Sequence, residues 1–456
     1  MRHCLLSAAT LVTLLLGSTV GAQDAPYSVV YYSLTSDPVS TRRMLEAVKQ
    51  MGATRALTLV YWWRADTLDD DTYWRDDYQP DDMGEGYLRS LDLFVSTCHE
   101  LGIRPSLRLG SFREFDGYWH PADKTRSIDN YAAWVEQLAR RYSGKIDHYI
   151  IGDEENKAHA QMNWDGTAAT YYHRMFLPLA RAIRKGDPHA AISTCGVSSA
   201  PATQWLLELI QLGLPQHGDG VAMNLWHEML DDPWQVEQAM KRIRAAWPSV
   251  KFYASGVGYA INRGLDDEHQ AGTVARTLFN LWDLGWDSAP YYLFAFSITA
   301  DTKQNYGLVG IGQDGAIHFS AAARAYKTIA RVFNDRASLK SPDFKITLQQ
   351  AQEVPVEGML PLHLAPPDPV CKAFVRDGQE LLLYLDYRGW KPPVHGIWNI
   401  TLESPRWIRP QRVELTAPDV QHDIPHQRDE QRIVLKQVRI GPRPVILRLS
   451  ASDGGS

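Results

Sequence analysis

Residues 147 to 156 read Asp147-His148-Tyr149-Ile150-Ile151-Gly152-Asp153-Glu154-Glu155-Asn156, an apolar run that ends in a glycine, three carboxylates and an amide. A strand of a parallel sheet is buried on both faces, so a short continuous apolar run such as 149–151 is typical of one. In α/β folds, the residues just beyond the carboxyl end of such a strand carry the chemistry. The neighbouring sequence decides whether this stretch is such a strand end or an ordinary charged loop.

Strand-like and helix-like segments alternate on both sides of this stretch. The expected strands are residues 28–34, 55–62, 104–109, 149–151, 191–194, 220–224, 252–255 and 291–296. The expected helices are residues 40–51, 87–101, 129–142, 167–185, 203–212, 234–246, 269–284 and 321–332. Eight strand and helix pairs in strict alternation imply a parallel sheet with right-handed crossovers, and eight such strands close a barrel. We therefore expect an α/β fold, a (β/α)8 TIM barrel over residues 25–336.

The pattern changes beyond Asn334. Short strand-like runs at 380–384, 398–402 and 445–449 are separated by Pro-rich turns, with no helical period between them. This pattern is typical of antiparallel sheets. We expect a small C-terminal antiparallel β-sandwich over residues 337–450, followed by a tail at 451–456.

The first residues have the features of a signal peptide over residues 1–22. Arg2 and His3 precede an apolar run at 5–16, and the small residues at 20–22 suit cleavage before Gln23. The apolar run is too short to span a bilayer as a retained helix. We therefore expect a secreted or periplasmic protein that has no membrane span once the signal is removed.

Composition narrows the classes of partner. A net charge of -6 gives no electrostatic footprint for nucleic acid. The 15 Trp and 21 Tyr are amphipathic rings that also serve as platforms for sugars, which favours a carbohydrate partner. Cys98, Cys195 and Cys371 remain after the leader, an odd number that argues against a disulfide framework. No Cys and His cluster has zinc spacing. We expect neither a metal nor a cofactor.

Carboxylates, arginines and aromatic rings follow the expected strands, and in a barrel these strand ends meet at one rim. They are Trp63 and Arg64 after the second strand; Arg108, Asp116 and Trp119 at the third; Asp153, Glu154, Glu155 and Asn156 after the fourth; Asn224, Trp226, His227 and Glu228 at the sixth; Ser255, Gly256 and Tyr259 at the seventh; and Phe296 and Asp301 at the eighth. Paired carboxylates with stacking rings are what the cleavage of a glycosidic bond requires.

In these residues the sequence resembles the clan A glycoside hydrolases, barrel enzymes with catalytic glutamates after strands four and seven. Residues 149–156 are similar to the family's strand-four ending, an apolar run leading into Asn-Glu-Pro-Asn, and residues 291–332 are similar to its strand-eight region. The resemblance implies that Glu154 is the general acid/base, with Asp153 in place of the family's Asn. From their places at the strand ends, we expect the following residues to bind substrate: Asp153, Asn156, Arg64, Arg108, Trp63, Trp119, Trp226, His227, Tyr259 and Phe296.

One departure from the family concerns the second carboxylate. Residues 255–259, Ser-Gly-Val-Gly-Tyr, are similar to the family's Thr-Glu-x-Gly-Trp, and Gly256 stands in the place of the nucleophilic glutamate. A retaining mechanism needs a second carboxylate about 5 Å from the first. Either another acid supplies it, or the protein binds glycans without cleaving them, or the register of strand seven differs. The acids available for the first account are Glu155, Glu228, Asp116 and Asp301.

These observations predict an exported glycoside hydrolase that cleaves an oligo- or polysaccharide. Glu154 is expected to act as general acid/base, and Glu155 and Glu228 are further catalytic candidates. The alternative is a catalytically inactive carbohydrate-binding protein on the same barrel.

Overall fold

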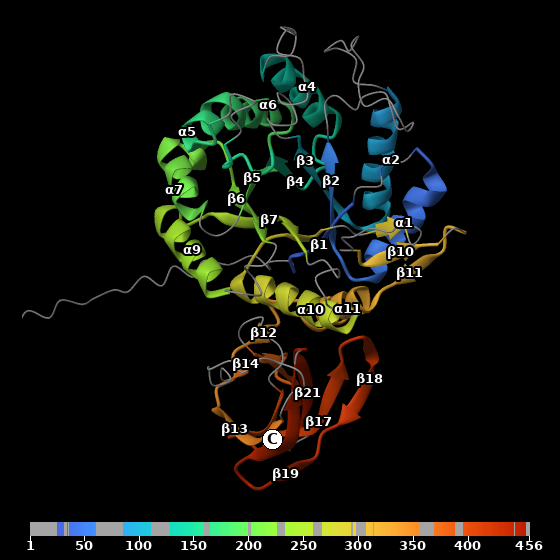
Figure 1. Ribbon diagram of the computed structural model, residues 1–456, viewed down its shortest axis with the longest axis vertical. Coiled ribbons are helices and arrows are strands. Elements are labelled where there is room, and N and C mark those ends of the chain that lie inside the picture. Colours follow the sequence, from blue (N-terminus) through green and yellow to red (C-terminus); the bar gives the residue numbers. More distant parts are fainter. Residues whose placement is uncertain are drawn as a thin grey trace, which may run out of the picture.

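In the computed structural model, the chain folds into a barrel surrounded by helices and a set of antiparallel sheets below it, as Figure 1 shows. The structure describes residues 25–31, 34, 36–60, 85–110, 128–158, 165–198, 202–225, 233–258, 267–292, 295–297, 307–312, 314–354, 369–387, 395–441 and 443–452.

Eight parallel strands close into a barrel in chain order, which confirms the predicted fold class. They are β1 Tyr27–Val30, β2 Arg55–Val60, β3 Arg104–Leu109, β4 His148–Ile151, β5 Ala191–Ser198, β6 Gly220–Leu225, β7 Lys251–Val257 and β8 Ala289–Tyr291. The barrel closes where β1 pairs with β8, with Tyr27 opposite Ala289 and Val29 opposite Tyr291. All eight carboxyl ends therefore meet at one rim.

Helices surround the barrel (Figure 1). They are α1 Pro38–Gln50, α2 Glu85–Leu101, α4 Ile128–Arg141, α5 Ala168–Tyr171, α6 Leu177–Gly186, α7 Thr203–Leu212, the short η5 Leu214–Gln216, α9 Pro233–Ala246, α10 Asp267–Leu284 and α11 Ala321–Val332. In α1, the Asp37 side chain caps the first turn by accepting from the backbone N–H groups of Val39 and Ser40. Met44, Leu45 and Val48 are buried on one face, as the apolar spacing predicts.

The helix expected at 167–185 is divided into three parts. Between α5 and α6 lies a π-helical turn, η3 Tyr172–Phe176. Such turns occur mostly as single insertions in α-helices, frequently at functional sites. The apolar spacing over 167–185 predicts one continuous helix and does not indicate this turn.

The eighth strand is shorter than the expected 291–296. β8 ends at Tyr291, and the following β9 Ala295–Ser297 pairs with β10 Val309–Ile311, which in turn pairs with β11 Ile317–Phe319. The run from 291 to 296 is aromatic throughout much of its length, and such a run does not show where a strand leaves one sheet for another.

Side chains fill the interior of the barrel. One apolar layer consists of Val30, Leu57, Leu59, Ile150, Ala222 and Tyr253. The His148 ring stacks on the Tyr253 ring with centroids 3.7 Å apart, and its Nε2 lies 2.8 Å from Ser193 Oγ. Burial lowers the pKa of His148 to about 3, so this imidazole is neutral at ordinary pH. Because the interior is packed, the rim is the place where a ligand can bind.

The C-terminal strands form two antiparallel sheets, in agreement with a sandwich. One sheet has the order β12-β14-β15-β21-β17-β18 and the other β13-β16-β20-β19. Their bounds are β12 Leu339–Lys340, β13 Ile346–Val354, β14 Pro369–Arg376, β15 Glu380–Tyr387, β16 His395–Leu402, β17 Trp407–Glu414, β18 Ala417–Asp423, β19 His426–Arg428, β20 Ile433–Ile440 and β21 Val445–Ala451. The expected tail at 451–456 thus begins one residue too early, because Ala451 still pairs with Trp407.

Helix α10 joins the barrel to the sandwich (Figure 1). Arg276 on α10 makes two hydrogen bonds of 2.6 Å to the Asp386 carboxylate on β15. One turn further on, the Phe279 ring stacks on the Tyr384 ring with centroids 3.5 Å apart. Both contacts are buried, so the two parts share a packed interface. Among the helices that the structure describes, none is long and apolar enough to cross a membrane.

Candidate active site

The end of β4 departs from strand geometry within three residues. Gly152 has φ +86°, and Glu154 has φ +55°, a left-handed value that residues other than glycine rarely adopt. Between them Asp153 pairs with Gly196 of β5, and the Glu154 N–H donates to the Gly196 carbonyl at 2.9 Å. Successive side chains of a strand point to opposite faces. The left-handed residue breaks this alternation, so Asp153 and Glu154 turn toward the same side.

A tyrosine hydroxyl joins β4 to β5 below this turn. The Tyr171 hydroxyl donates to the Ile151 carbonyl at 2.8 Å and accepts from the Cys195 N–H at 2.8 Å. Burial raises the pKa of Tyr171 well above its ordinary value, so the hydroxyl keeps its proton and can donate. The hydroxyl thereby bridges the two strands in the gap between the Ile150–Ser193 pair and the Asp153–Gly196 pair.

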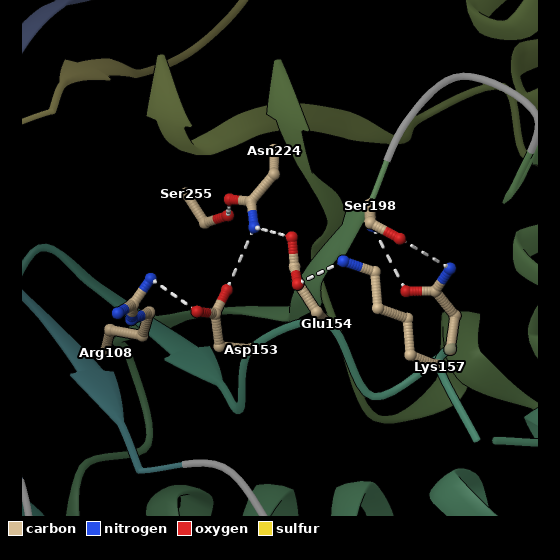
Figure 2. Close-up of polar contacts among 8 residues, drawn as sticks. Arg108, Asp153, Glu154, Lys157, Ser198, Asn224 and Ser255 are labelled. Atoms are coloured by element: carbon tan, nitrogen blue, oxygen red, sulfur yellow. Dashed lines mark hydrogen bonds and ion pairs between the residues drawn. The ribbon is translucent and has the colours of Figure 1, made fainter. Parts of the chain in front are cut away.

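Two carboxylates converge on one buried amide, as Figure 2 shows. Asn224 Nδ2, at the end of β6, donates to Asp153 Oδ1 at 3.1 Å and to Glu154 Oε1 at 3.3 Å. Arg108 Nη1, from β3, lies 3.1 Å from Asp153 Oδ2. Side chains from two strands, β3 and β6, therefore hold Asp153, and the same amide orients Glu154.

Both carboxylates still reach solvent. The side chain of Asp153 is 21% exposed and that of Glu154 is 17% exposed. Lys157 Nζ lies 2.5 Å from Glu154 Oε2, in an i,i+3 ion pair whose lysine is half-exposed. The rim thus presents two accessible carboxyl groups, one held by arginine and amide and the other by lysine and the same amide.

On the β7 side of the site, Ser255 contacts the amide that holds Asp153 and Glu154. The β6–β7 register runs from Met223 opposite Ala254 to Asn224 opposite Gly256, so Ser255 is an extra residue at an irregularity. The Ser255 hydroxyl donates to Asn224 Oδ1 and fixes which way the amide points (Figure 2). The side chain that β7 directs toward the site is therefore a hydroxyl, and Gly256 lies beside it.

The close approach of β5 to this serine requires a glycine. A Cβ atom on Gly196 would lie 1.6 Å from Ser255 Oγ and 2.9 Å from Asn224 Oδ1. No side chain fits there without displacing the amide that holds both carboxylates.

Glu155 does not share the rim with its neighbours. Its side chain is fully buried, and its Oε1 accepts from the Asp153 N–H at 3.4 Å. It lies under Gly152, where a Cβ would be 2.9 Å from Glu155 Oε1. A carboxylate without solvent exposure cannot contact a substrate in this conformation, so the structure gives no support to the prediction that Glu155 is catalytic.

Two of the predicted substrate-binding residues instead organise the rim. Asn156 Nδ2 donates to Ser198 Oγ at 3.2 Å, and its Oδ1 accepts from the Ser198 N–H at 3.1 Å, which ties the loop to the end of β5. Arg108 is buried against Asp153.

Phe296 lies on β9, opposite Gly310 of β10.

The remaining predicted site residues lie outside the described residues. They are Trp63, Arg64, Trp119, Trp226, His227, Glu228 and Tyr259, with the reserve acids Asp116 and Asp301.

Sequence reasoning assigned no role to several residues that shape the site. Asn224 and Ser255 are polar residues at the ends of apolar strands, a signal that marks them as rim positions. Lys157 follows Glu154 at helical spacing. Tyr171 carries no such signal, because an aromatic residue in a helix is usually core.

Comparisons with known proteins support the fold. No protein-family model matches the sequence, and no curated protein matches it. Among solved structures, a family 51 α-L-arabinofuranosidase from Bifidobacterium longum has 13% identity and a TM-score of 0.58, covering 94% of this chain and 97% of its own.

Two further solved structures are similar over nearly the whole chain. A glucosidase from Croceicoccus marinus has 14% identity and a TM-score of 0.56, covering 95% of this chain and 97% of its own. A GH39 β-xylosidase from Caulobacter crescentus has 13% identity and a TM-score of 0.54, covering 94% and 98%. At such low identity the likeness concerns the fold alone, and the chain has the fold of these clan A glycoside hydrolases.

Proposed function

We propose that this protein is a glycosidase in which Glu154 is the general acid/base. The observation that carries the proposal is the position of Glu154. It follows β4 at the rim, is oriented by Asn224, and remains 17% exposed in a left-handed backbone conformation. That conformation costs about 1–2 kcal/mol for a residue other than glycine. Strained backbone of this kind clusters at functional sites.

The neighbouring groups suit this role. Asn224 holds Glu154 Oε1, which fixes the direction in which a proton would be delivered to a glycosidic oxygen. Lys157 lies on Oε2 and would stabilise the carboxylate left after proton transfer. The substrate we propose is an oligo- or polysaccharide, in keeping with the similar structures of a glucosidase and a β-xylosidase.

We propose a secreted or periplasmic location, because residues 1–22 have the sequence features of a signal peptide. Detection of the mature chain, beginning at Gln23, in a periplasmic or culture fraction would test it.

A second candidate function is glycan binding without cleavage. It is favoured by one observation: β7, which supplies the nucleophile in the resembled family, presents Ser255 and Gly256 at the rim and contains no carboxylate. Under this hypothesis Glu154 would bind a sugar hydroxyl.

The Glu154→Gln variant separates the two candidates. A glycosidase predicts that wild-type protein releases reducing sugar from at least one member of a broad glycan panel. The variant should lose this activity by a factor of about 100 to 10,000, the usual contribution of a general acid or base. Binding of the same glycan, measured by calorimetry, should survive. Glu208→Gln, at an exposed position of α7, is the matched control and should keep full activity.

If wild-type protein binds a glycan but cleaves no member of the panel, the binding function replaces the proposed one. If Glu154→Gln cleaves as fast as wild type, Glu154 is not the acid.

A further inference from the structure

The two carboxylates of the rim are a constructed pair rather than chance neighbours. Asp153 and Glu154 are consecutive, and only the left-handed φ of Glu154 turns both toward Asn224. Gly196 and Ser255 are packed so that this amide has one orientation. Strain and close packing at one place indicate that both carboxylates, and not Glu154 alone, serve the site.

Asp153 does not lie opposite Glu154. Asp153 Oδ1 and Glu154 Oε1 lie 3.1 and 3.3 Å from the same nitrogen, so they are at most 6.4 Å apart, the sum of the two distances. This limit allows the separation of about 5–5.5 Å that is found between the two carboxyl groups of a retaining enzyme. In a retaining enzyme, however, the two carboxyl groups lie on opposite faces of the sugar. Here the Asn224 amide bridges Asp153 and Glu154, so both carboxylates lie on the same side of the site. Asp153 therefore cannot attack the face of a sugar opposite to Glu154.

Asp153 lies beside the acid Glu154, on the same side of the site, and is placed to accept a hydrogen bond from the substrate. Arg108 forms an ion pair with one Asp153 oxygen and Asn224 donates to the other, which keeps the group fixed, while 21% of the side chain remains exposed. A carboxylate accepts and does not donate when ionised, so it selects a donor. The acid Glu154 acts on the oxygen bound to the anomeric carbon, C1. The substituent on the neighbouring carbon, C2, is therefore the part of the sugar that lies closest to Asp153. An amide N–H there is a donor whose carbonyl oxygen can reach the anomeric carbon.

We propose that the substrates are 1,2-trans glycosides of 2-acetamido sugars, and that the substrate's own acetamido oxygen replaces the missing nucleophile of β7. This inference rests on the proposed function, because it assigns a substrate class and a second catalytic residue, Asp153, to the same site. In substrate-assisted cleavage one carboxyl group acts as the acid, a second carboxylate holds the amide, and the substrate itself supplies the nucleophile.

The steps balance. The Glu154 carboxyl proton moves to the glycosidic oxygen, the bond from that oxygen to C1 breaks, and the acetamido oxygen forms a bond to C1. The product is a cyclic oxazolinium ion, whose N–H and positive charge Asp153 stabilises. A water molecule then gives a proton to the Glu154 carboxylate and attacks C1, the bond from C1 to the acetamido oxygen breaks, and the amide is restored. The anomeric configuration is retained. The 1,2-trans requirement follows because the acetamido oxygen must attack from the face opposite the leaving group.

Four aryl glycosides test the proposal on the full-length mature protein. They are 4-methylumbelliferyl 2-acetamido-2-deoxy-β-D-glucoside, its 2-hydroxy counterpart, and the difluoroacetamido and trifluoroacetamido analogues. We expect hydrolysis of the acetamido compound, no hydrolysis of the 2-hydroxy compound, and a stepwise fall in kcat/KM with fluorination, because fluorine makes the carbonyl oxygen a poorer nucleophile. These measurements use wild-type protein, so they do not depend on whether a variant folds.

The Asp153→Asn variant adds a residue-specific measurement. It keeps the shape of the side chain but loses the charge that stabilises the oxazolinium ion, so kcat for the acetamido compound should fall on the order of 100-fold with a smaller change in KM. Glu208→Gln again serves as the control for expression and folding.

The outcomes separate this inference from the proposed function. Hydrolysis of the 2-hydroxy compound as fast as the acetamido compound, or a rate that does not respond to fluorination, would show that the protein supplies the nucleophile. Either result overturns this inference and leaves the glycosidase standing. No hydrolysis of these compounds, together with no cleavage in the broad glycan panel, overturns both.

Discussion

At the scale of single residues, the site depends on backbone conformations that place side chains where a regular strand would not. Glu154 reaches the same amide as Asp153 only because its φ is +55°. Gly196 leaves the space that Ser255 and Asn224 occupy. A small set of local exceptions thus converts an ordinary strand end into a pair of oriented carboxyl groups.

His148, inside the barrel, gives a prediction about pH. Its folded-state pKa is lowered to about 3 by burial, below the ordinary 6.5, so the unfolded chain binds the proton more readily between these values. The stability that this neutral histidine contributes is complete above pH 6.5 and is lost as the pH falls from 6.5 toward 3. Below pH 6.5, the free energy of unfolding of wild type should fall more steeply than that of His148→Gln, by about 1.4 kcal/mol per pH unit.

Urea unfolding at several pH values between 7.5 and 4.5 measures this difference. His189→Gln, at an exposed position between α6 and β5, is the control. Parallel pH profiles for wild type and His148→Gln would mean that His148 does not stay neutral in the folded protein.

The sequence predicted part of this site. Glu154 and Asp153 could be singled out because they follow an apolar strand, and Arg108 was recognised as a rim residue because it is a charged residue near the end of the third strand. The burial of Glu155 could not be foreseen, because no periodicity applies to a loop. The bridging role of Asn224 depends on a contact between β4 and β6, which are far apart in sequence and not neighbours in the barrel.

At the scale of elements, the joint between β4 and β5 carries the site. The Tyr171 hydroxyl satisfies the Ile151 carbonyl and the Cys195 N–H at the point where the two strands separate. Tyr171→Phe would leave two buried backbone groups without this partner, at a cost of about 1–3 kcal/mol each. We expect a lower melting temperature and a fall in kcat with little change in KM, because the positions of Asp153 and Glu154 depend on this joint.

Tyr142→Phe is the matched control for this variant. The Tyr142 hydroxyl donates to Asp92 Oδ1 at 2.9 Å, away from the β4–β5 joint, so its loss should affect stability without changing kcat. If Tyr171→Phe lowers the melting temperature but keeps the wild-type kcat, the hydroxyl is structural only.

Most elements could be predicted because their apolar periodicity agrees with their burial. The bounds expected for the third strand and for the helix at 203–212 are those of β3 and α7. The misplaced eighth strand and the π-helical turn have a different origin. Both depend on which neighbouring strand or helix a segment pairs with, and that information is absent from local periodicity.

At the scale of the whole molecule, one buried ion pair links the barrel to the sandwich. The side chains of Arg276 and Asp386 are 9% and 7% exposed and share two hydrogen bonds. Breaking such a pair from one side leaves an uncompensated buried charge, which costs about 3–5 kcal/mol. Arg276→Met should therefore strongly reduce the free energy of unfolding, and the double variant Arg276→Met with Asp386→Leu should recover much of the loss.

A second ion pair across the same interface supplies the control. Arg331 on α11 pairs with Asp419 on β18, but the two side chains are 54% and 80% exposed. Exposed pairs contribute about 0–1 kcal/mol, so Arg331→Met should be nearly neutral. Denaturant unfolding of the three variants and of wild type tests the comparison, and equal losses for Arg276→Met and Arg331→Met would contradict it.

In the proposed mechanism, Glu154 donates a proton to the leaving group. The most direct measurement compares Glu154→Gln with wild type on two glycosides of the same sugar, one with a sugar leaving group and one with a 2,4-dinitrophenyl leaving group. A dinitrophenolate departs without protonation, whereas a sugar alkoxide does not. We predict that the variant loses about 100- to 10,000-fold in the bond-cleaving step for the first substrate and far less for the second. Equal losses on both substrates, or no loss on either, would contradict the assignment of Glu154 as the general acid.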